Sequence, residues 1–564
     1  MVTGSWPADS QPQKAKATEI FLAHDLLKLV IYVIETPMEA RTSVARSSII
    51  VGGATFASRL FGLLREQTFA YLFGAGFATD AFVAAFRLPN LLRDLFAEGA
   101  LSAAFVPVFT EHLINKGKKE AFRLANLVIN GLMVILAVVI TFGIIITPYL
   151  VKLIAPGFSR IPGKSELTAL LAQIMFPFLL FISLAAVSMG MLNTLRHFGV
   201  PALAPVFLNL GMILAGFFLS PYFSPPIIGM ALGVLLGGLG QWLFQVPLLV
   251  KEGYRYQPLL SWRDPGFRKI LVLMTPAVLG LASTQINIFV NTVIASLLPE
   301  GSPSYLNYSF RLMHFPLGVF GIAVATVTLP VVSAYAAKRD IPMALATCRS
   351  SLELVAFLTI PSSFFLALVS QPIISVLYEH GRFTAADTLA TSQALLFYSF
   401  GLFSYAALRV VAQVFYSFQD TKTPVKVSFL SIAFNIVLNL WLMHPLSFRG
   451  LALATSAAAT VNFLILSFLL TKRFGSPGWK ELSREVVKIL LASIFMGATL
   501  LAIGRFWPLK LSQVNLAGKV AYLAVLLAAG VVTYALGCFV LKIKELPFLL
   551  RIFKREKGQA PSEK

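Results

Sequence analysis

Long apolar stretches separated by short polar segments run through most of this 564-residue chain. Apolar runs of about 18 or more residues are typical of membrane-spanning helices, because such a helix crosses the hydrocarbon core of a bilayer. Proline and glycine inside several runs are acceptable, since neighbouring helices can satisfy the backbone groups that they free. The pattern predicts about fourteen spans, at residues 44–72, 79–112, 122–150, 166–195, 200–220, 226–250, 268–298, 304–335, 344–370, 387–418, 424–443, 450–471, 485–506 and 516–541.

The composition agrees with a membrane protein. Hydrophobic residues make up 57% of the chain and charged residues only 13%, whereas soluble proteins carry roughly 25% charged residues. The two cysteines, Cys348 and Cys538, lie far apart in the sequence and indicate neither a disulfide framework nor a metal site. We therefore expect an all-α polytopic membrane protein without a sizeable soluble domain.

The net charge of +21 raises the question of nucleic-acid binding. Most basic residues, however, lie in loops between apolar spans, which is the positive-inside pattern of a polytopic membrane protein. When the loops are assigned alternately to two sides, 29 lysines and arginines fall on one side and 8 on the other. This bias predicts no nucleic-acid partner, both termini in the cytoplasm and a basic cytoplasmic tail at residues 546–564.

Residues 1–43 precede the first predicted span and do not resemble a signal peptide. Their apolar stretch is short and is interrupted by His24, Asp25 and Lys28. Met38 lies just before the first span. We expect either that Met38 is the true start or that the segment is a dispensable extension.

An internal repeat is visible at one spacing. Phe-Arg-Leu occurs at residues 86–88 and again at 310–312, an offset of 224, and two proline pairs share an offset of 223, Pro107 with Pro330 and Pro201 with Pro424. A six-helix unit keeps both copies in the same topology, as in the parallel repeats of some transporters. We predict an N-lobe (44–250, helices 1–6) and a C-lobe (251–480, helices 7–12) around a central cavity, followed by two additional helices at 481–545.

Charged residues lie inside or at the ends of the first two spans. A charge at the bilayer centre costs at least about 2.5–3.5 kcal/mol, so such residues face a bundle interior or a wet cavity and are functional candidates. On an ideal helix, spacings of 7, 7 and 4 place four of them on one face. The alternative is a charge network that only holds helices together. The charged residues are Arg59, Arg65, Asp80, Arg87, Arg93, Asp94 and Glu98, of which Asp80, Arg87, Asp94 and Glu98 share the face.

Two later spans add Arg311, the repeat mate of Arg87, and Arg409, for which an interfacial position is an equally good interpretation. Several arginines on one cavity favour an anionic partner, because the guanidinium group binds phosphate or carboxylate through two parallel hydrogen bonds. Enzymatic motifs are not evident. The six histidines are scattered and no Walker A sequence occurs. The sequence therefore predicts a transporter rather than an enzyme, with no cofactor.

Several motifs closely resemble the MurJ (MviN) family of lipid II flippases, over about residues 42–545. The first block is long and specific. The motifs are Ser58-Arg59-Leu60-Phe61-Gly62-Leu63-Leu64-Arg65-Glu66, Phe73-Gly74-Ala75-Gly76, Thr79-Asp80-Ala81-Phe82, Arg87-Leu88-Pro89-Asn90-Leu91-Leu92-Arg93, Phe96-Ala97-Glu98-Gly99-Ala100, Ala104-Phe105-Val106-Pro107, Gly381-Arg382-Phe383-Thr384, Phe415-Tyr416-Ser417 and Asp420-Thr421-Lys422-Thr423-Pro424-Val425-Lys426.

This resemblance implies a fold of the multidrug/oligosaccharidyl-lipid/polysaccharide exporter superfamily, with two lobes around a cavity and a lipid-tail groove on the two additional helices. It implies a monomer in the bacterial inner membrane that moves lipid II, the undecaprenyl-pyrophosphate-linked disaccharide pentapeptide, between leaflets by alternating access. The alternatives are export of another polyprenyl-linked oligosaccharide and drug/cation antiport. The residues that carry over are Arg59, Arg65, Asp80, Arg93 and Arg311 in the cavity, with Glu98 at a gate and Ser58 beside them.

Two departures from the family accompany the resemblance. Some members have acidic residues beside the arginine of span 8, where this chain has Phe310 and His314. The family also implies a sodium site, to which Asn287, Asn435 and Asn439 could contribute, although no carboxylate lies in those spans. Coupling to Na⁺ or to the membrane potential is the corresponding expectation.

Overall fold

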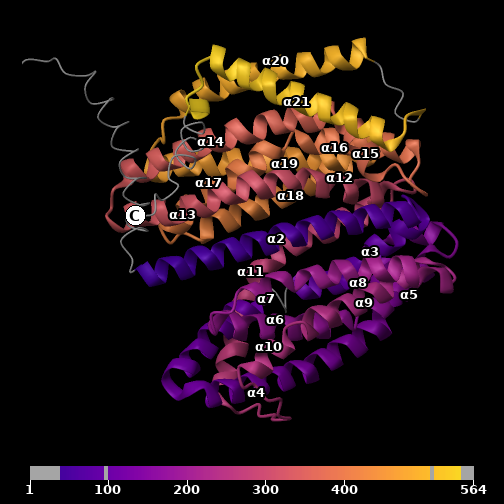
Figure 1. The fold of residues 1–564 in the computed structure, drawn as a ribbon, viewed down its shortest axis with the longest axis vertical. Helices are drawn as coiled ribbons and strands as arrows, with labels where there is room; N and C mark the ends of the chain where they lie inside the picture. Colours follow the sequence, from indigo (N-terminus) through magenta and orange to yellow (C-terminus); the bar gives the residue numbers. More distant parts are fainter. Residues whose placement is uncertain (1–37, 95–99, 508–512, 548–564) are drawn as a thin grey trace, which may run out of the picture.

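The computed structural model describes residues 38–94, 100–507 and 513–547, and these form helices packed into two bodies with an additional helix pair (Figure 1). The first body occupies the indigo-to-magenta half of Figure 1. It contains α2 (Met38–Phe73), α3 (Phe77–Arg93), α4 (Ala100–Ile154), η2 (Pro156–Arg160), α5 (Lys164–Met175), α6 (Phe178–Thr194), α7 (Gly199–Leu203), α8 (Pro205–Phe218), η3 (Ser220–Tyr222), α9 (Ile227–Leu243) and α10 (Val246–Lys251).

The long helix α11 (Pro265–Ser296) leads into the second body, and α20 and α21 cover the far side of that body (Figure 1). The remaining elements are α12 (Ser302–Pro316), η4 (Leu317–Gly321), α13 (Ile322–Ala337), α14 (Ile341–Leu368), α15 (Ser370–Tyr378), α16 (Ala385–Ser399), α17 (Leu402–Ser417), α18 (Lys422–Leu446), α19 (Phe448–Phe474), α20 (Trp479–Phe506) and α21 (Leu516–Val540).

The helical membrane architecture predicted from the apolar pattern is confirmed. Among the described residues, eleven helices are long and apolar enough to cross a membrane. Large apolar side chains such as Phe142, Phe218, Trp441 and Phe468 face outward, which suits a hydrocarbon environment rather than water. The count of fourteen spans stays a prediction, and the predicted extension at residues 1–37 lies outside the described part of the chain.

Several predicted spans are broken into two helices. The predicted span 166–195 contains α5 and α6, which meet at Pro177, because proline lacks the N–H that would continue the helical ladder. The predicted loop 113–121 is instead a single break within α4, at Gly117, whose φ of 81° and ψ of 173° lie outside the helical region. Glycine adopts this positive φ without the steric cost that a side chain would bring.

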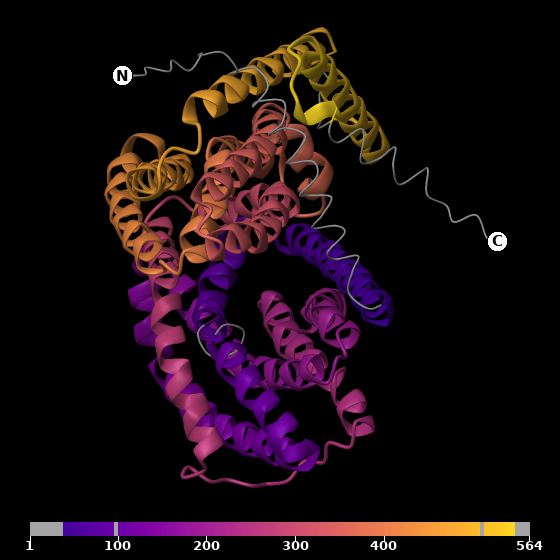
Figure 2. The same ribbon diagram turned by 90° about the vertical axis from the view of Figure 1, so that its left-hand side faces the viewer.

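The two bodies have separate apolar cores that meet along α11. Phe267 and Ile270, near the start of α11, belong to the core of the first body. Ile294 and Ala295, near its end, belong to the core of the second body. Figure 2 shows this helix running alongside both bodies. The connection between the bodies is therefore a packed helix and not a free linker.

Candidate functional site: an arginine-lined cavity between the bodies

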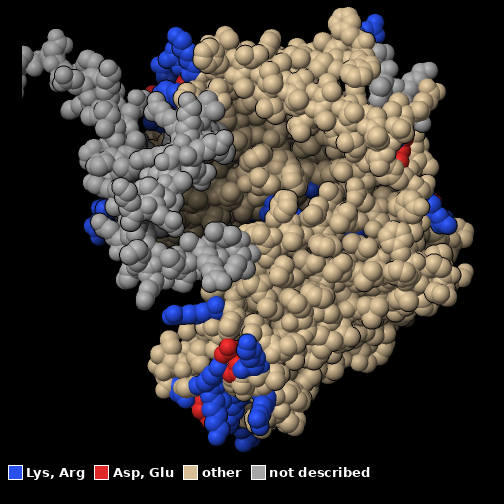
Figure 3. Space-filling view, in the orientation of Figure 1, with Lys and Arg blue, Asp and Glu red and all other residues tan. Residues whose placement is uncertain are grey.

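A cavity of about 240 Å³ lies where α2, α3 and α8 of the first body face α12 of the second. Figure 3 shows the surface hollowed between the two bodies, with basic side chains inside the hollow. Four of the arginines predicted from the sequence line it. The lining consists of Arg65, Glu66, Phe69, Thr79, Phe82, Val83, Phe86, Arg87, Asn90, Arg93, Leu208, Met212, Asn307, Tyr308 and Arg311.

Glu66 holds two of these arginines from opposite bodies. Its Oε1 accepts a hydrogen bond from Nη2 of Arg65 at 2.5 Å and lies 3.0 Å from Nε of Arg311. The Glu66 side chain is 9% exposed, whereas Arg311 is 43% exposed toward the cavity. One carboxylate therefore offsets two guanidinium groups, and the remaining positive charge is available to an anion.

Glu66 also supplies the acidic partner of Arg311 that some family members carry beside this arginine on the same helix. His314 follows Arg311 by three positions, and its Nδ1 lies 3.0 Å from the carbonyl oxygen of Phe310, so this end of α12 supplies no acid. The acid that pairs with Arg311 comes instead from α2 of the other body. The ion pair thus crosses the cavity between bodies rather than running along one helix.

Arg87 and Arg93 extend the basic lining along α3. Nη2 of Arg93 donates to Asp94 at 2.8 Å, and the other carboxylate oxygen of Asp94 accepts from Nε2 of Gln285 on α11 at 3.1 Å. Asp94 is therefore engaged by Arg93 on its own helix and by α11. Glu98, the predicted gate residue, lies outside the described residues.

Arg59 and Ser58 lie on α2 outside the cavity lining. The Arg59 side chain is exposed and packs against η4, since a Cβ placed on Gly318 would meet its Nη1 at 2.7 Å. The backbone carbonyl of Ser58 accepts a hydrogen bond from Nδ2 of Asn209 on α8 at 3.3 Å. These two residues thus adjoin the inter-body space on the side of η4 and α8.

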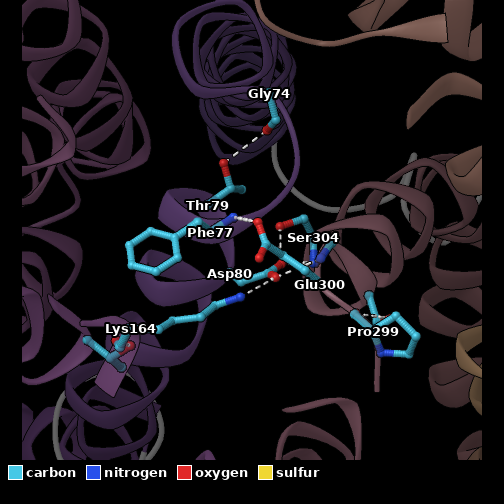
Figure 4. A network of polar contacts seen from close by, with 11 residues as sticks. Gly74, Phe77, Thr79, Asp80, Lys164, Pro299, Glu300 and Ser304 are labelled. Carbon is cyan, nitrogen blue, oxygen red and sulfur yellow. Dashed lines mark hydrogen bonds and ion pairs between the residues drawn. The ribbon is translucent and has the colours of Figure 1, made fainter. Parts of the chain in front are cut away.

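Asp80 does not line the cavity and is not paired with the predicted arginines. It is fully buried, and Figure 4 shows Nζ of Lys164 reaching its carboxylate, at 2.9 Å. The same carboxylate accepts from the backbone N–H groups of Gly301 at 2.8 Å and Ser304 at 3.0 Å, and from the Ser304 hydroxyl at 2.5 Å. The expectation that Asp80 lies in the cavity is therefore wrong for this structure, in which its carboxylate contacts the first turn of α12 instead.

The predicted asparagine site is a hydrogen-bonded cluster between α11 and α18. Nδ2 of Asn439 donates to Oδ1 of Asn291 at 2.6 Å and to Oδ1 of Asn435 at 3.0 Å, and Asn291 in turn donates to Oδ1 of Asn287 at 3.4 Å. Three of the four carbonyl oxygens already accept from amides, which leaves only Oδ1 of Asn439 without a partner. A carbonyl oxygen that accepts one hydrogen bond keeps a second lone pair, so the four oxygens remain compatible with Na⁺, and Na⁺ coupling stays a prediction.

Sequence reasoning missed Glu66 and Lys164. Glu66 could have been predicted from the sequence, because burying a carboxylate in an apolar span is costly, as burying an arginine is. Nothing in the sequence indicated a role for Lys164, because it precedes a predicted span and resembles any other lysine of a loop. Its partner Asp80 is 84 residues away in the chain.

Two helical bodies around a cationic cavity in an apolar molecule are the architecture of a membrane transporter. The fold matches that of a multidrug resistance MATE family transporter of the MOP superfamily in an inward-facing conformation, with a TM-score of 0.63 over 77% of this chain and 99% of that one, at 15% identity. Residues 69–520 match the family model described as lipid II flippase MurJ, and the chain belongs to this family.

Individual relatives agree with the family match. A probable lipid II flippase MurJ of Vibrio cholerae is 39% identical over 86% of this chain and 96% of its own length. One from Haemophilus influenzae is 38% identical over 79% and 89%. A solved structure of lipid II flippase MurJ in an inward closed conformation has a TM-score of 0.73 and 30% identity, covering 87% of this chain and 98% of that one.

Proposed function

We propose that the protein moves lipid II from the cytoplasmic to the periplasmic leaflet of the bacterial inner membrane by alternating access. The observation that carries this proposal is the cavity between the bodies, which Arg65, Arg87, Arg93 and Arg311 line together. A pyrophosphate cannot cross about 30 Å of hydrocarbon without its charge being met. Arginine meets it in paired hydrogen bonds, which a lysine cannot reproduce.

The two bodies would present this cavity to one leaflet and then to the other. Arg65 belongs to the first body and Arg311 to the second, so a bound pyrophosphate would contact both. Rocking of one body against the other would change the exposure of the site while the polyprenyl tail stays in lipid, as repeat-based transporters do. Release requires that the ligand bind less tightly in the outward state, because equal affinity for both states shifts no equilibrium.

The orientation proposed is that both termini and the more basic loops face the cytoplasm. Figure 3 shows lysine and arginine side chains gathered over the end of the molecule where the α4 break and the start of α20 lie, and few at the opposite end. Positive loops remain on the cytoplasmic side during insertion. We also propose a monomer, with a lipid-tail groove on α20 and α21. This pair packs on the second body through a small apolar cluster that includes Phe357 of α14 and Ile489 of α20.

The experiment is complementation of a conditional flippase-depletion strain, combined with lipid II translocation by the purified protein in liposomes. Arg311→Ala should lower binding and translocation about tenfold or more, because a charged hydrogen bond contributes about 1.5–3 kcal/mol. Arg311→Lys should restore only part of the activity. Arg123→Ala is the control, because Arg123 is exposed and pairs with Glu120 on the α4 surface. Near-normal translocation by Arg311→Ala at equal membrane abundance would refute the proposal.

A further inference from the structure

The two bodies touch at the end of the cavity where the first turns of α3 and α12 face each other. Each turn is met by a carboxylate of the other body. Asp80 of α3 accepts from Gly301 and Ser304 of α12, and Oε1 of Glu300, just before α12, accepts from the backbone N–H of Phe77 at 2.8 Å. Figure 4 shows both contacts in one network. The first N–H groups of a helix have no partner within the helix, and a carboxylate there is favoured by the helix dipole.

The contact follows the internal repeat. Phe77 and Glu300 are 223 residues apart, and Asp80 and Ser304 are 224 residues apart, which are the spacings of the repeat itself. Equivalent positions of the two halves therefore contact each other, as expected where two related bodies meet at their common axis. The reciprocal capping is a product of the repeat and joins the bodies at one end of the cavity.

Lys164 differs from the other partners of Asp80, because it belongs to the same body. It is the first residue of α5, its side chain is 1% exposed, and its Nζ lies 4.6 Å from the centre of the Phe158 ring. If the bodies separate at this end, Asp80 leaves Gly301 and Ser304 but keeps Lys164. The capping contacts are therefore the breakable part of the network, and the Lys164–Asp80 pair is its fixed part.

We propose that Asp80, Lys164 and the first turn of α12 form a latch that closes this end of the cavity, with Lys164 as the positioning residue that keeps the Asp80 carboxylate buried and ready to cap α12. This inference rests on the proposed alternating access. Without Lys164, the Asp80 carboxylate would be buried without a counter-charge in the closed latch, whereas water would solvate it in the open state. Lys164 thereby favours the closed state over the open one.

Removing one charge of a buried pair leaves the other uncompensated, which is far more costly than removing both. Lys164→Met therefore leaves the Asp80 charge unpaired, and Asp80→Asn leaves Lys164 unpaired, and either variant should open the latch. The double variant contains no buried charge, and the side-chain oxygen of asparagine can still cap α12, since asparagine is as good a cap as aspartate. It should lie closer to the wild type than either single variant.

The test measures access to the latch, not transport. Ser302, the first residue of α12, is 1% exposed and serves as the reporter when replaced by cysteine in a background carrying Cys348→Ala and Cys538→Ala. Modification by a membrane-impermeant maleimide in intact spheroplasts is followed over time. Arg160→Cys, at an exposed position of the same end, is the control for reagent access and is expected to react equally in every variant.

Lys164→Met and Asp80→Asn should each raise the labelling rate of the Ser302→Cys reporter by about tenfold or more. The double variant and Lys164→Arg should return the rate toward that of the wild type. Equal thermal stability of the variants in detergent separates an opened latch from a misfolded chain. Unchanged labelling in Lys164→Met, or additive effects in the double variant, would overturn the latch. Failure of the proposed function would be seen in a different measurement, as normal lipid II translocation by Arg311→Ala. That outcome does not depend on the labelling rate of the Ser302→Cys reporter.

Discussion

At the residue scale, the cost of burying charge is a good guide to the cavity and a poor guide to its partners. Arg65, Arg87, Arg93 and Arg311 were predicted because they lie in apolar spans, and the structure places all four on one cavity. The ion-pair partners of these arginines come from segments far apart in the chain, and the spacing of residues in the sequence does not predict such contacts. Glu66 therefore emerges only once α12 is seen to face α2.

Glu66→Gln should separate binding from release. The variant removes the carboxylate shared by Arg65 and Arg311, so both guanidinium groups become available to a pyrophosphate. We expect binding of inorganic pyrophosphate to the purified protein to tighten several-fold, and lipid II translocation to slow, because the ligand no longer has a competing carboxylate to displace it.

The matched control is Glu120→Gln, which removes an exposed carboxylate paired with Arg123 on α4. It should change neither quantity, since exposed pairs contribute about 0–1 kcal/mol. Weaker pyrophosphate binding in Glu66→Gln would show that Glu66 orients the arginines rather than competing with the ligand.

Asp420 offers a pH test outside the membrane spans. Burial disfavours its charge, but hydrogen bonds from the backbone and hydroxyl of Thr423 and the charge of Arg473 outweigh burial and hold the pKa of Asp420 below its usual value. Because the native pKa is lowered, the stabilisation is complete above the unfolded pKa of about 3.9 and is lost as the pH falls through the folded value.

Melting temperatures of the wild type and Asp420→Ala in detergent, measured from pH 7 to pH 3, test this dependence. The wild type should melt about 1–4 °C higher than the variant at pH 7, as expected for loss of a helix cap. The difference should shrink below about pH 4. A difference that stays constant down to pH 3 would mean that the contribution of Asp420 does not depend on its charge.

At the scale of elements, the apolar pattern predicts where helices lie but not where they break or how closely they approach. Proline explains the break between α5 and α6, yet proline also lies inside α3, α4 and α14 without ending them. Neighbouring helices decide between these outcomes. The distance between two packed helices likewise depends on which small residues face each other, as Gly211 of α8 and Gly237 of α9 do. The sequence alone does not show such pairs.

Gly237 should be intolerant of a side chain, because α8 and α9 touch there backbone to backbone. A Cβ on Gly237 would lie 2.7 Å from the Cα of Leu208, whereas one on Gly240, a turn further along α9, would meet the Phe207 side chain at an ordinary 3.5 Å. Gly237→Ala should lower thermal stability in detergent by about 1–3 kcal/mol, the usual cost of overpacking. Gly240→Ala should be close to neutral. Similar losses in both variants would show that helix propensity rather than packing governs this contact.

At the scale of the whole molecule, the repeat was readable from the sequence, whereas the way in which its halves meet was not. One tripeptide match and two proline pairs, at offsets of 224 and 223, predicted two related units. The same spacings recur in the contacts between the first turns of α3 and α12, which required the fold. Charge bias in the loops is likewise a whole-molecule signal, and it predicts orientation without locating any residue in space.

The orientation can be tested at two glycines that both have a positive φ. Gly117, at the break in α4, and Gly163, just before α5, have φ values of 81° and 78°, and a Cβ on either would meet no atom closer than 4.0 Å. A cysteine should cost more at Gly117, whose ψ of 173° lies in a region that essentially only glycine adopts, than at Gly163, whose ψ is −10°. The two variants are therefore compared at equal membrane abundance. With the more basic loops in the cytoplasm, a membrane-impermeant thiol reagent should label Gly163→Cys in intact spheroplasts, and Gly117→Cys only after the membrane is broken. Labelling of Gly117→Cys but not Gly163→Cys in intact spheroplasts would invert the topology, and with it the direction in which the closed latch faces.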